Sequence, residues 1–117
     1  PKLYHYPPDP LFINRPFSLD MVTDIPDALI QSVSLLFKTD QMENYREISL
    51  KGSHGLYRFK VKTDEFPGKS INYFFVIYTN DKKIYGAPLD SKGIISPVKR
   101  KFLEPIQYYN RKKRLNQ

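Results

Sequence analysis

The sequence contains no cysteine and no tryptophan among its 117 residues, and only five glycines and two histidines. Without cysteine, neither a disulfide framework nor a thiolate metal site is possible. The two histidines, His5 and His54, lie far apart in sequence and in loop-like surroundings. Because metal ions need clustered ligands, we expect no metal site. The few glycines form no phosphate-binding glycine-rich loop, so we expect no cofactor.

Signals of catalysis are also lacking. No G-x-S-x-G nucleophile motif is present, and Ser53-His54 is the one local pairing of a hydroxyl with a base. Adjacent residues on a strand or turn usually point apart. The carboxylates Asp64 and Glu65 fall in a charged turn, where we expect them to be solvated. We therefore predict no catalytic residue and a protein that is not an enzyme.

Long hydrophobic runs are missing. The most apolar stretch, residues 71–79, is nine residues of mostly aromatic and β-branched type, bounded by Pro67-Gly68 and Asn80-Asp81. It is far shorter than the roughly 20 residues of a spanning helix, and its composition predicts a buried central strand. The sequence starts at Pro1 without signal-peptide features, although a removed signal peptide leaves no trace. We expect a periplasmic or secreted protein, with the cytoplasm as the alternative.

Aromatic residues and proline are abundant, with nine tyrosines, eight phenylalanines and ten prolines. This composition favours strands and turns over helices. Apolar and polar residues alternate in several segments, which is typical of half-buried strands. The expected strands cover residues 16–23, 29–39, 45–50, 56–62 and 71–79, a partner strand begins at residue 84, and residues 94–95 resume pairing.

Six or seven short strands at this spacing predict an all-β protein, an antiparallel immunoglobulin-like β-sandwich of about seven strands. We assign the sandwich to residues 16–98. Residues 1–15, which are rich in proline, are predicted to form an extended N-terminal arm. Residues 99–117 are predicted to form a basic C-terminal tail.

The succession of four segments, VSLLFKTD at 33–40, YREISL at 45–50, LYRFKV at 56–61 and GKSINYFFV at 68–76, resembles immunoglobulin-like and fibronectin type III-like modules of bacterial envelope and secreted proteins. The resemblance covers about residues 16–98. It implies a scaffold or binding role and carries no catalytic residues. The absence of tryptophan and of a cysteine pair excludes an antibody-type domain. Tyr73, two residues before Phe75, stands where a tyrosine corner is expected, but we favour a plain core residue at this position, with the corner as the alternative.

The net charge of +7 is concentrated at the C-terminal end. From residue 99 onward there are seven basic residues and one acid, while residues 1–98 are nearly neutral. These basic residues are the candidate polyanion-binding set: Lys99, Arg100, Lys101, Arg111, Lys112, Lys113 and Arg114. Interleaved aromatic rings suit stacking on bases or sugars. A basic C-terminal segment is nevertheless most often a solvated extension or a linker into a neighbour, and docking to a protein partner comes before polyanion binding. The near-neutral body counts against a dedicated nucleic-acid domain. Pro105 is suited to the first turn of a short helix running to residue 115.

Five aromatic residues are candidate partner-binding residues: Phe74, Tyr78, Tyr85, Tyr108 and Tyr109. The first three are expected on the outward face of their strands, and the last two as anchors on the tail. Both faces of residues 71–79 are apolar, so we expect the arms or a partner to cover the second face. The sequence therefore predicts a non-catalytic interaction or assembly module that engages protein partners in an envelope or secreted complex. A module that binds a polyanion or a glycan through the tail is the alternative.

Overall fold

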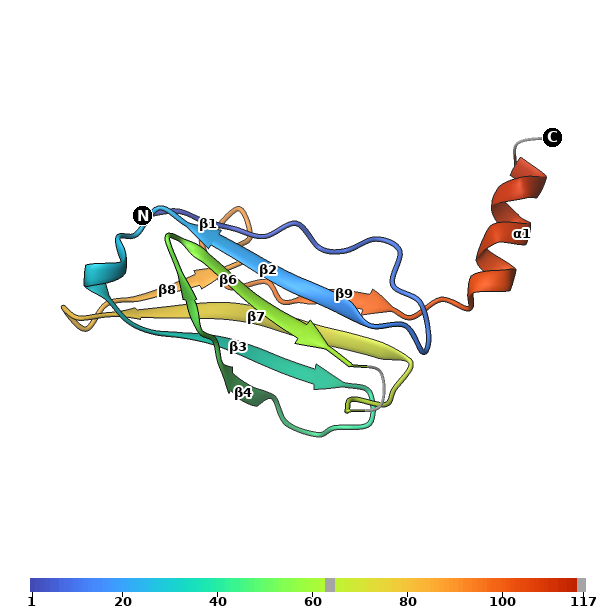
Figure 1. The fold of residues 1–117 in the computed structure, drawn as a ribbon, viewed down its shortest axis with the longest axis horizontal. Coiled ribbons are helices and arrows are strands. Elements are labelled where there is room, and N and C mark those ends of the chain that lie inside the picture. Colours follow the sequence, from blue (N-terminus) through green and yellow to red (C-terminus); the bar gives the residue numbers. More distant parts are fainter. Residues whose placement is uncertain (63–64, 116–117) are drawn as a thin grey trace.

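The structure, a computed structural model, describes residues 1–62 and 65–115. In these residues two antiparallel sheets pack against each other (Figure 1). The first sheet has the order β1-β2-β6-β5, with β1 at Leu3–Tyr4, β2 at Phe17–Thr23, β6 at Leu56–Val61 and β5 at Gly52–Ser53. The second has the order β4-β3-β7-β8, with β4 at Arg46–Ser49, β3 at Ile30–Thr39, β7 at Ser70–Thr79 and β8 at Ile84–Ala87. A further strand, β9 at Val98–Lys101, also pairs with β7.

The core lies between the two sheets and is built from alternate residues of the long strands. Because successive side chains on a strand point to opposite faces, residues two apart share one face. The buried residues of β7 follow this rule: Ile71, Tyr73, Phe75 and Ile77 are at most 1% exposed. They meet Val33, Leu35 and Phe37 of β3, and Leu19 and Met21 of β2. The prediction of an all-β protein is confirmed, and the strands predicted by alternation are present within one or two residues of their expected bounds.

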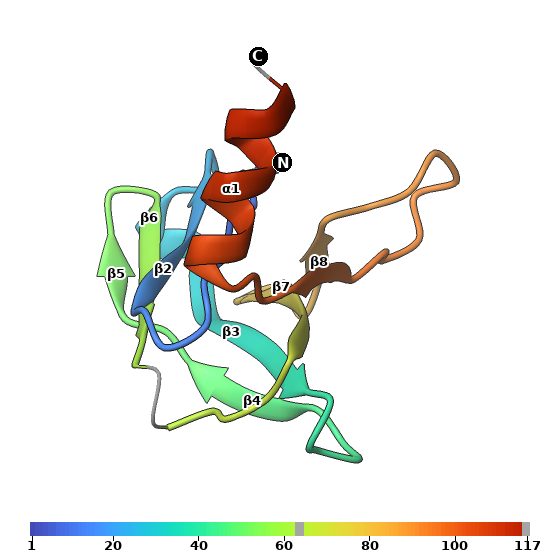
Figure 2. The same ribbon diagram turned by 90° about the vertical axis from the view of Figure 1, so that its right-hand side faces the viewer.

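The edge of the second sheet is made of two strand segments separated by an excursion of the chain. β8 pairs with residues 75–78 of β7, and β9 pairs with residues 70–73 of the same strand. Residues 88–97 leave the sheet between them and are joined by a single bridge between Leu89 and Ile95. This excursion projects from the sandwich (orange in Figure 2). Lys99, Arg100 and Lys101 therefore belong to β9, and the tail boundary that charge placed at residue 99 falls inside a strand.

The N-terminal segment joins both sheets. β1 pairs with the end of β2, through Leu3 with Thr23 and Tyr4 with Val22. Further along, Phe12 forms a parallel bridge with Leu103. The Leu103 amide donates to the Leu11 carbonyl at 2.8 Å, and the Ile13 amide donates to the Leu103 carbonyl at 2.9 Å. The segment expected to be an extended arm is thus hydrogen-bonded to the sandwich at two places.

One α-helix, α1 at Pro105–Leu115, is present among the described residues, where the sequence predicts it. Proline is suited to its first turn because the amide that proline lacks has no partner there. The Glu104 carboxylate accepts a hydrogen bond from the Gln107 amide at 2.7 Å, which caps the helix. The helix extends away from one end of the sandwich (Figure 1). In the described part of the chain, no helix has the length and apolar character needed to cross a membrane.

Candidate functional site

His5 and Tyr73 form a polar contact inside the sandwich. The Tyr73 hydroxyl lies 2.6 Å from Nε2 of His5, and Nδ1 of His5 lies 2.6 Å from the Asp20 carbonyl oxygen. Nδ1 therefore carries the proton and donates to the carbonyl, while Nε2 accepts from the tyrosine hydroxyl. The His5 ring also contacts the Phe75 ring, with centroids 4.9 Å apart. His5 thereby holds the N-terminal segment against the core, a role that its proline-rich surroundings in the sequence do not indicate.

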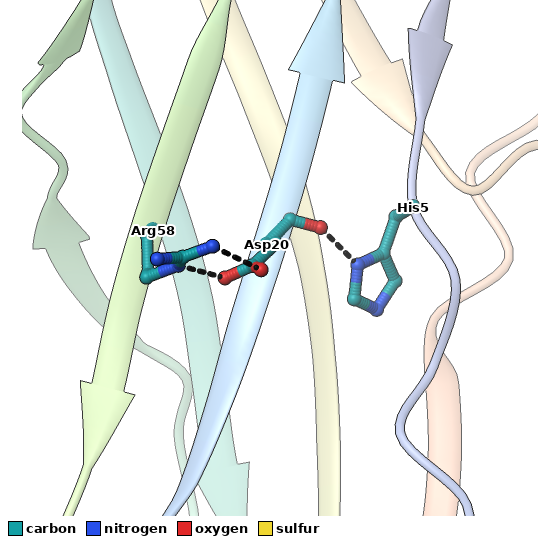
Figure 3. Close-up of polar contacts among 3 residues, drawn as sticks. All are labelled: His5, Asp20 and Arg58. Atoms are coloured by element: carbon teal, nitrogen blue, oxygen red, sulfur yellow. Dashed lines mark hydrogen bonds and ion pairs between the residues drawn. The ribbon is translucent and has the colours of Figure 1, made fainter.

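Figure 3 shows Asp20 of β2 between two partners, with His5 on one side and Arg58 on the other. The Asp20 carbonyl accepts from His5, whereas the Asp20 carboxylate receives two hydrogen bonds from the Arg58 guanidinium, at 2.8 and 3.0 Å. The two side chains are 39% and 49% exposed. An exposed pair of this kind contributes at most about 1 kcal/mol. Arg58 therefore aligns β2 with β6 and does not touch the histidine.

The electrostatics of the contact favour neutral groups. Burial lowers the pKa of His5, against a smaller opposing effect of its hydrogen bond with Asp20. Burial also raises the pKa of Tyr73 well above its usual range. Both groups are therefore neutral near pH 7, with Tyr73 fully buried and His5 half-buried at the edge of a cleft next to β8. Among the described residues, the hydrogen bond of the Tyr73 hydroxyl is with His5 of the N-terminal segment and not with the backbone before β7 that a tyrosine corner uses.

A second cluster of polar residues lies around His54, at the turn between β5 and β6. Contrary to the expectation that neighbouring side chains point apart, Ser53 Oγ lies 3.2 Å from Nδ1 of His54. His54 has a φ of 55° and Gly55 one of 81°, and this left-handed turn brings the two side chains together. The Asp27 carboxylate accepts from the His54 backbone amide at 3.0 Å and not from the ring. A nucleophile needs an oriented base, which this exposed pair lacks among the described hydrogen bonds.

Metal binding has no candidate site in residues 1–62 and 65–115, where no group of three or more potential ligands is found. Candidate binding surfaces remain. They lie on α1, on the outer face of the second sheet, and in a cleft lined by the β2–β3 and β7–β8 connections. These connections lie at the end of the sandwich opposite α1 (Figure 1).

The surface of α1 combines aromatic and basic side chains. The ring of Phe12 packs against those of Tyr108 and Tyr109, with centroids 5.5 and 5.9 Å apart, and so seats the helix. Tyr109 nevertheless remains 55% exposed, and Ile106 on the same side of the helix is 70% exposed. The sequence identified both tyrosines as anchors, and the structure shows that Tyr108 is the more buried of the two. Phe12 carried no signal for this role in the sequence.

The candidate polyanion-binding residues divide into two groups. Lys99, Arg100 and Lys101 lie on the edge strand β9, and Arg111 to Arg114 lie on the last turns of α1. All seven are exposed. None of them is in an ion pair among the described residues. The basic residues that cluster at the C-terminal end of the sequence are thus distributed over two elements of the structure, β9 and α1.

The aromatic residues expected on the outer face differ in their positions. Phe74 is half-buried there, and its ring packs against Tyr45 with centroids 5.2 Å apart. Tyr78 is also half-buried, opposite Ile84 of β8. Tyr85 was expected to face outward, but its register places it beside Ile77, and it packs against the core. That prediction is wrong because Ile84 pairs with Tyr78 and takes the outward position, which leaves Tyr85 on the core face.

Cover for the outer face comes from the chain itself. Val76 is 5% exposed, although it points away from the core, and its neighbour on β8 is Gly86. A Cβ atom on Gly86 would lie 2.5 Å from Cδ1 of Ile95, so the Ile95 side chain lies directly over this glycine. The excursion therefore helps to bury the face that the sequence assigned to the arms or a partner. The N-terminal segment instead covers the inner residues Tyr73 and Phe75.

A cleft of about 560 Å³ opens where the β2–β3 and β7–β8 connections meet. Its apolar walls are Ile25, Pro26, Leu29 and Tyr85. Leu29 is 54% exposed. Two carboxylates, Asp24 and Asp81, also line the cleft. The Asp81 carboxylate accepts a short hydrogen bond from the Thr79 hydroxyl, which lowers its pKa, so the group stays ionised near neutral pH.

In comparisons with known proteins, no family model and no curated protein matches the chain.

Proposed function

We propose that this protein is a non-catalytic interaction or assembly module built on an immunoglobulin-like sandwich. The sheet orders β1-β2-β6-β5 and β4-β3-β7-β8 support this, because they correspond to the A-B-E-D and C′-C-F-G orders of that fold. The N-terminal segment pairs first with β2 and then in parallel with the chain after β9. It thereby connects the first sheet to the segment between β9 and α1. An envelope or secreted setting remains part of the proposal and rests on the resemblance of the strand pattern.

The observation that carries the proposal is the exposed face of α1. A helix of a globular protein usually turns its apolar side toward a core. Here Ile106 is 70% exposed and Tyr109 55% exposed, on positions three residues apart that share one face. Large apolar side chains that lie exposed together on one element often mark a surface that binds another molecule. We therefore assign this face as the partner-binding surface.

The charge of α1 defines the chemistry of the partner. Residues 111–114 are all basic and exposed, and they follow directly after the apolar positions. A matching partner is a protein surface with an apolar cleft and carboxylates at its rim, because complementary charge steers association and fixes register. A partner of this chemistry accounts for both the apolar and the basic residues of the helix.

Site-specific photo-crosslinking in cells of the source organism tests the proposal. A photoreactive amino acid at position 106 should give one discrete protein adduct. The charge-reversal variant R111E/K112E/K113E/R114E should lose that adduct. A photoreactive group at Lys60, which is exposed on β6 of the first sheet, is the matched control and should not give this adduct. The same adduct from both positions, or no adduct from position 106, would contradict the proposal.

Binding of a polyanion, including an acidic glycan, is the second candidate function. It is favoured by the seven exposed basic residues, which form no ion pair in the described part of the chain. Retention on immobilised heparin should then fall steeply with salt, because each neutralised charge releases a counterion. The variant K99E/K101E/K112E/K113E should elute much earlier than the control variant K51E/K60E. The control changes two exposed lysines away from the tail, one in the β4–β5 connection and one in β6. Equal elution of the two variants would remove this candidate.

A further inference from the structure

We propose that the cleft at one end of the sandwich receives helix α1 of a second copy of this chain, in a head-to-tail arrangement. The inference rests on the proposed function and identifies the partner of the α1 face. It joins two features that the fold leaves exposed, the apolar face of α1 and the cleft between the β2–β3 and β7–β8 connections.

The cleft has the size and lining of a docking site for side chains. Its volume of about 560 Å³ lies within the range of about 300–1,000 Å³ that is typical of binding pockets. Leu29 on its wall is 54% exposed. This side chain would lose contact with water when an apolar side chain enters the cleft. Burial of apolar area stabilises such a contact by roughly 25 cal/mol per Å².

The exposed face of α1 has the matching order of residues. Ile106 and Tyr109 are one helical turn apart, and Lys113 follows on the same face. In the docked arrangement Ile106 enters the apolar part of the cleft. The basic residues that follow it then lie near Asp24 and Asp81 at the rim.

The charges around the cleft agree with a basic occupant. Asp24 and Asp81 are the carboxylates among the lining residues, which also include Pro1 with its N-terminal ammonium, and Asp27 lies in the adjoining 3-10 turn, η1 at Asp27–Leu29. Lys83 lies 3.7 Å from the Asp81 carboxylate, with both side chains more than 60% exposed. That contact is long and hydrated, so it leaves Asp81 able to attract a second cation.

The geometry of the chain excludes docking within one molecule. Figure 1 places α1 at one end of the sandwich and the β7–β8 connection, with the N-terminus and η1, at the other. The longest dimension of the molecule is 54 Å. Two different surfaces at opposite ends make a heterologous contact, which continues from copy to copy unless the rotation closes a ring. The expected products are therefore open chains or rings of several copies and not closed two-fold dimers.

Two blocked variants and their mixture test the inference by sedimentation velocity. The wild-type protein should form species larger than a dimer, in proportions that rise with concentration. Leu29→Asp blocks the cleft, Ile106→Asp blocks the helix, and each variant alone should be monomeric. An equimolar mixture should form a one-to-one dimer and nothing larger, because one intact helix face and one intact cleft remain. Leu89→Asp, which changes a leucine of equal exposure in the excursion, is the control and should assemble like the wild type.

Several outcomes overturn the inference. These are a wild-type protein that stays monomeric at the highest soluble concentration, a mixture of blocked variants that forms no dimer, and a control that fails to assemble. Circular dichroism of each variant separates lost assembly from lost folding. If the protein is monomeric while a photoreactive group at position 106 still captures a different protein, the self-docking inference fails and the proposed function stands.

Discussion

Nε2 of His5 lies 2.6 Å from the hydroxyl oxygen of Tyr73, a residue that is 0% exposed and lies in the central strand β7. The contact spans 68 positions of sequence and connects the N-terminal segment to the core. It also determines where the segment runs, because the other ring nitrogen of His5 is held by the Asp20 carbonyl of β2.

Removal of the Tyr73 hydroxyl should destabilise the fold. The variant Tyr73→Phe keeps the ring in the core but leaves Nε2 of His5 without its donor. Leaving a buried polar atom unpaired costs about 1–3 kcal/mol, and we expect a loss of this size in the free energy of unfolding in urea. Tyr78→Phe removes a half-buried hydroxyl of the same strand that has no hydrogen bond among the described residues, and should change little. Equal effects of the two variants would show that the hydrogen bond to His5 contributes nothing.

Titration of His5 should make the protein less stable in mild acid. Burial lowers the pKa of His5 in the folded state below its ordinary value of 6.5. Below pH 6.5 the unfolded chain therefore takes up a proton that the folded chain does not, so stability is full above that pH and falls as the pH decreases. The decrease levels off once the pH is below the folded-state pKa.

Burial sets the direction of this shift, and the groups that face His5 modify its size. Asp20 opposes the lowering through its carbonyl and its charge, while the positive charge of Arg100 adds to it. Unfolding in urea between pH 8 and pH 5 measures the slope. In His5→Gln the slope assigned to this residue should vanish, and in His54→Gln, which removes the other histidine, it should persist. An unchanged slope in His5→Gln would assign the pH dependence to other groups.

The strands were predictable from sequence because their signal is local. In residues 56–61 the inward Tyr57 and Val61 are buried, while Arg58 and Lys60 on the opposite phase are exposed. This alternation depends only on the pleat of the strand and on one wet face. The same locality explains the success at α1, where Pro105 predicts the first turn of a short helix running to residue 115.

The position of Lys99 to Lys101 was not predictable in this way. A run of three basic residues indicates a solvated tail when only charge is considered. Charged residues also suit an exposed edge strand, where they discourage pairing with another sheet. Only the contact with Ser70 to Tyr73, about 28 positions earlier in the sequence, distinguishes the two cases. His5 was missed for the same reason, since its partner is remote in sequence.

The aromatic seat of α1 can be removed without touching the core. Phe12 is half-buried and contacts Tyr108 and Tyr109 of the helix, and its ring lies 5.2 Å from the Arg15 guanidinium. In Phe12→Ala the helix loses this packing, and an isolated helix of 11 residues is marginal in water. We expect hydrogen exchange of residues 105–115 to become faster, while exchange of β7 stays slow. Tyr45→Ala, which removes an aromatic contact on the outer sheet face, should leave exchange of α1 unchanged. If hydrogen exchange of residues 105–115 stays slow in Phe12→Ala, the packing of Phe12 does not hold the helix in place.

The packing of the excursion against β8 should be visible in a pair of variants at Gly86 and Ile95. In Gly86→Ala the new methyl group would lie 2.5 Å from Cδ1 of Ile95, closer than van der Waals contact allows. The side chain of Ile95 must then move away, which uncovers Val76 behind it, so we expect a loss of about 1–3 kcal/mol in the free energy of unfolding. In Gly86→Ala/Ile95→Ala the clash disappears, and the double variant should be more stable than the sum of the two single effects implies. Ile94→Ala, an exposed neighbour in the same excursion, should not relieve the clash when it is combined with Gly86→Ala. Additive effects of Gly86→Ala and Ile95→Ala would mean that the excursion does not rest on β8 in solution.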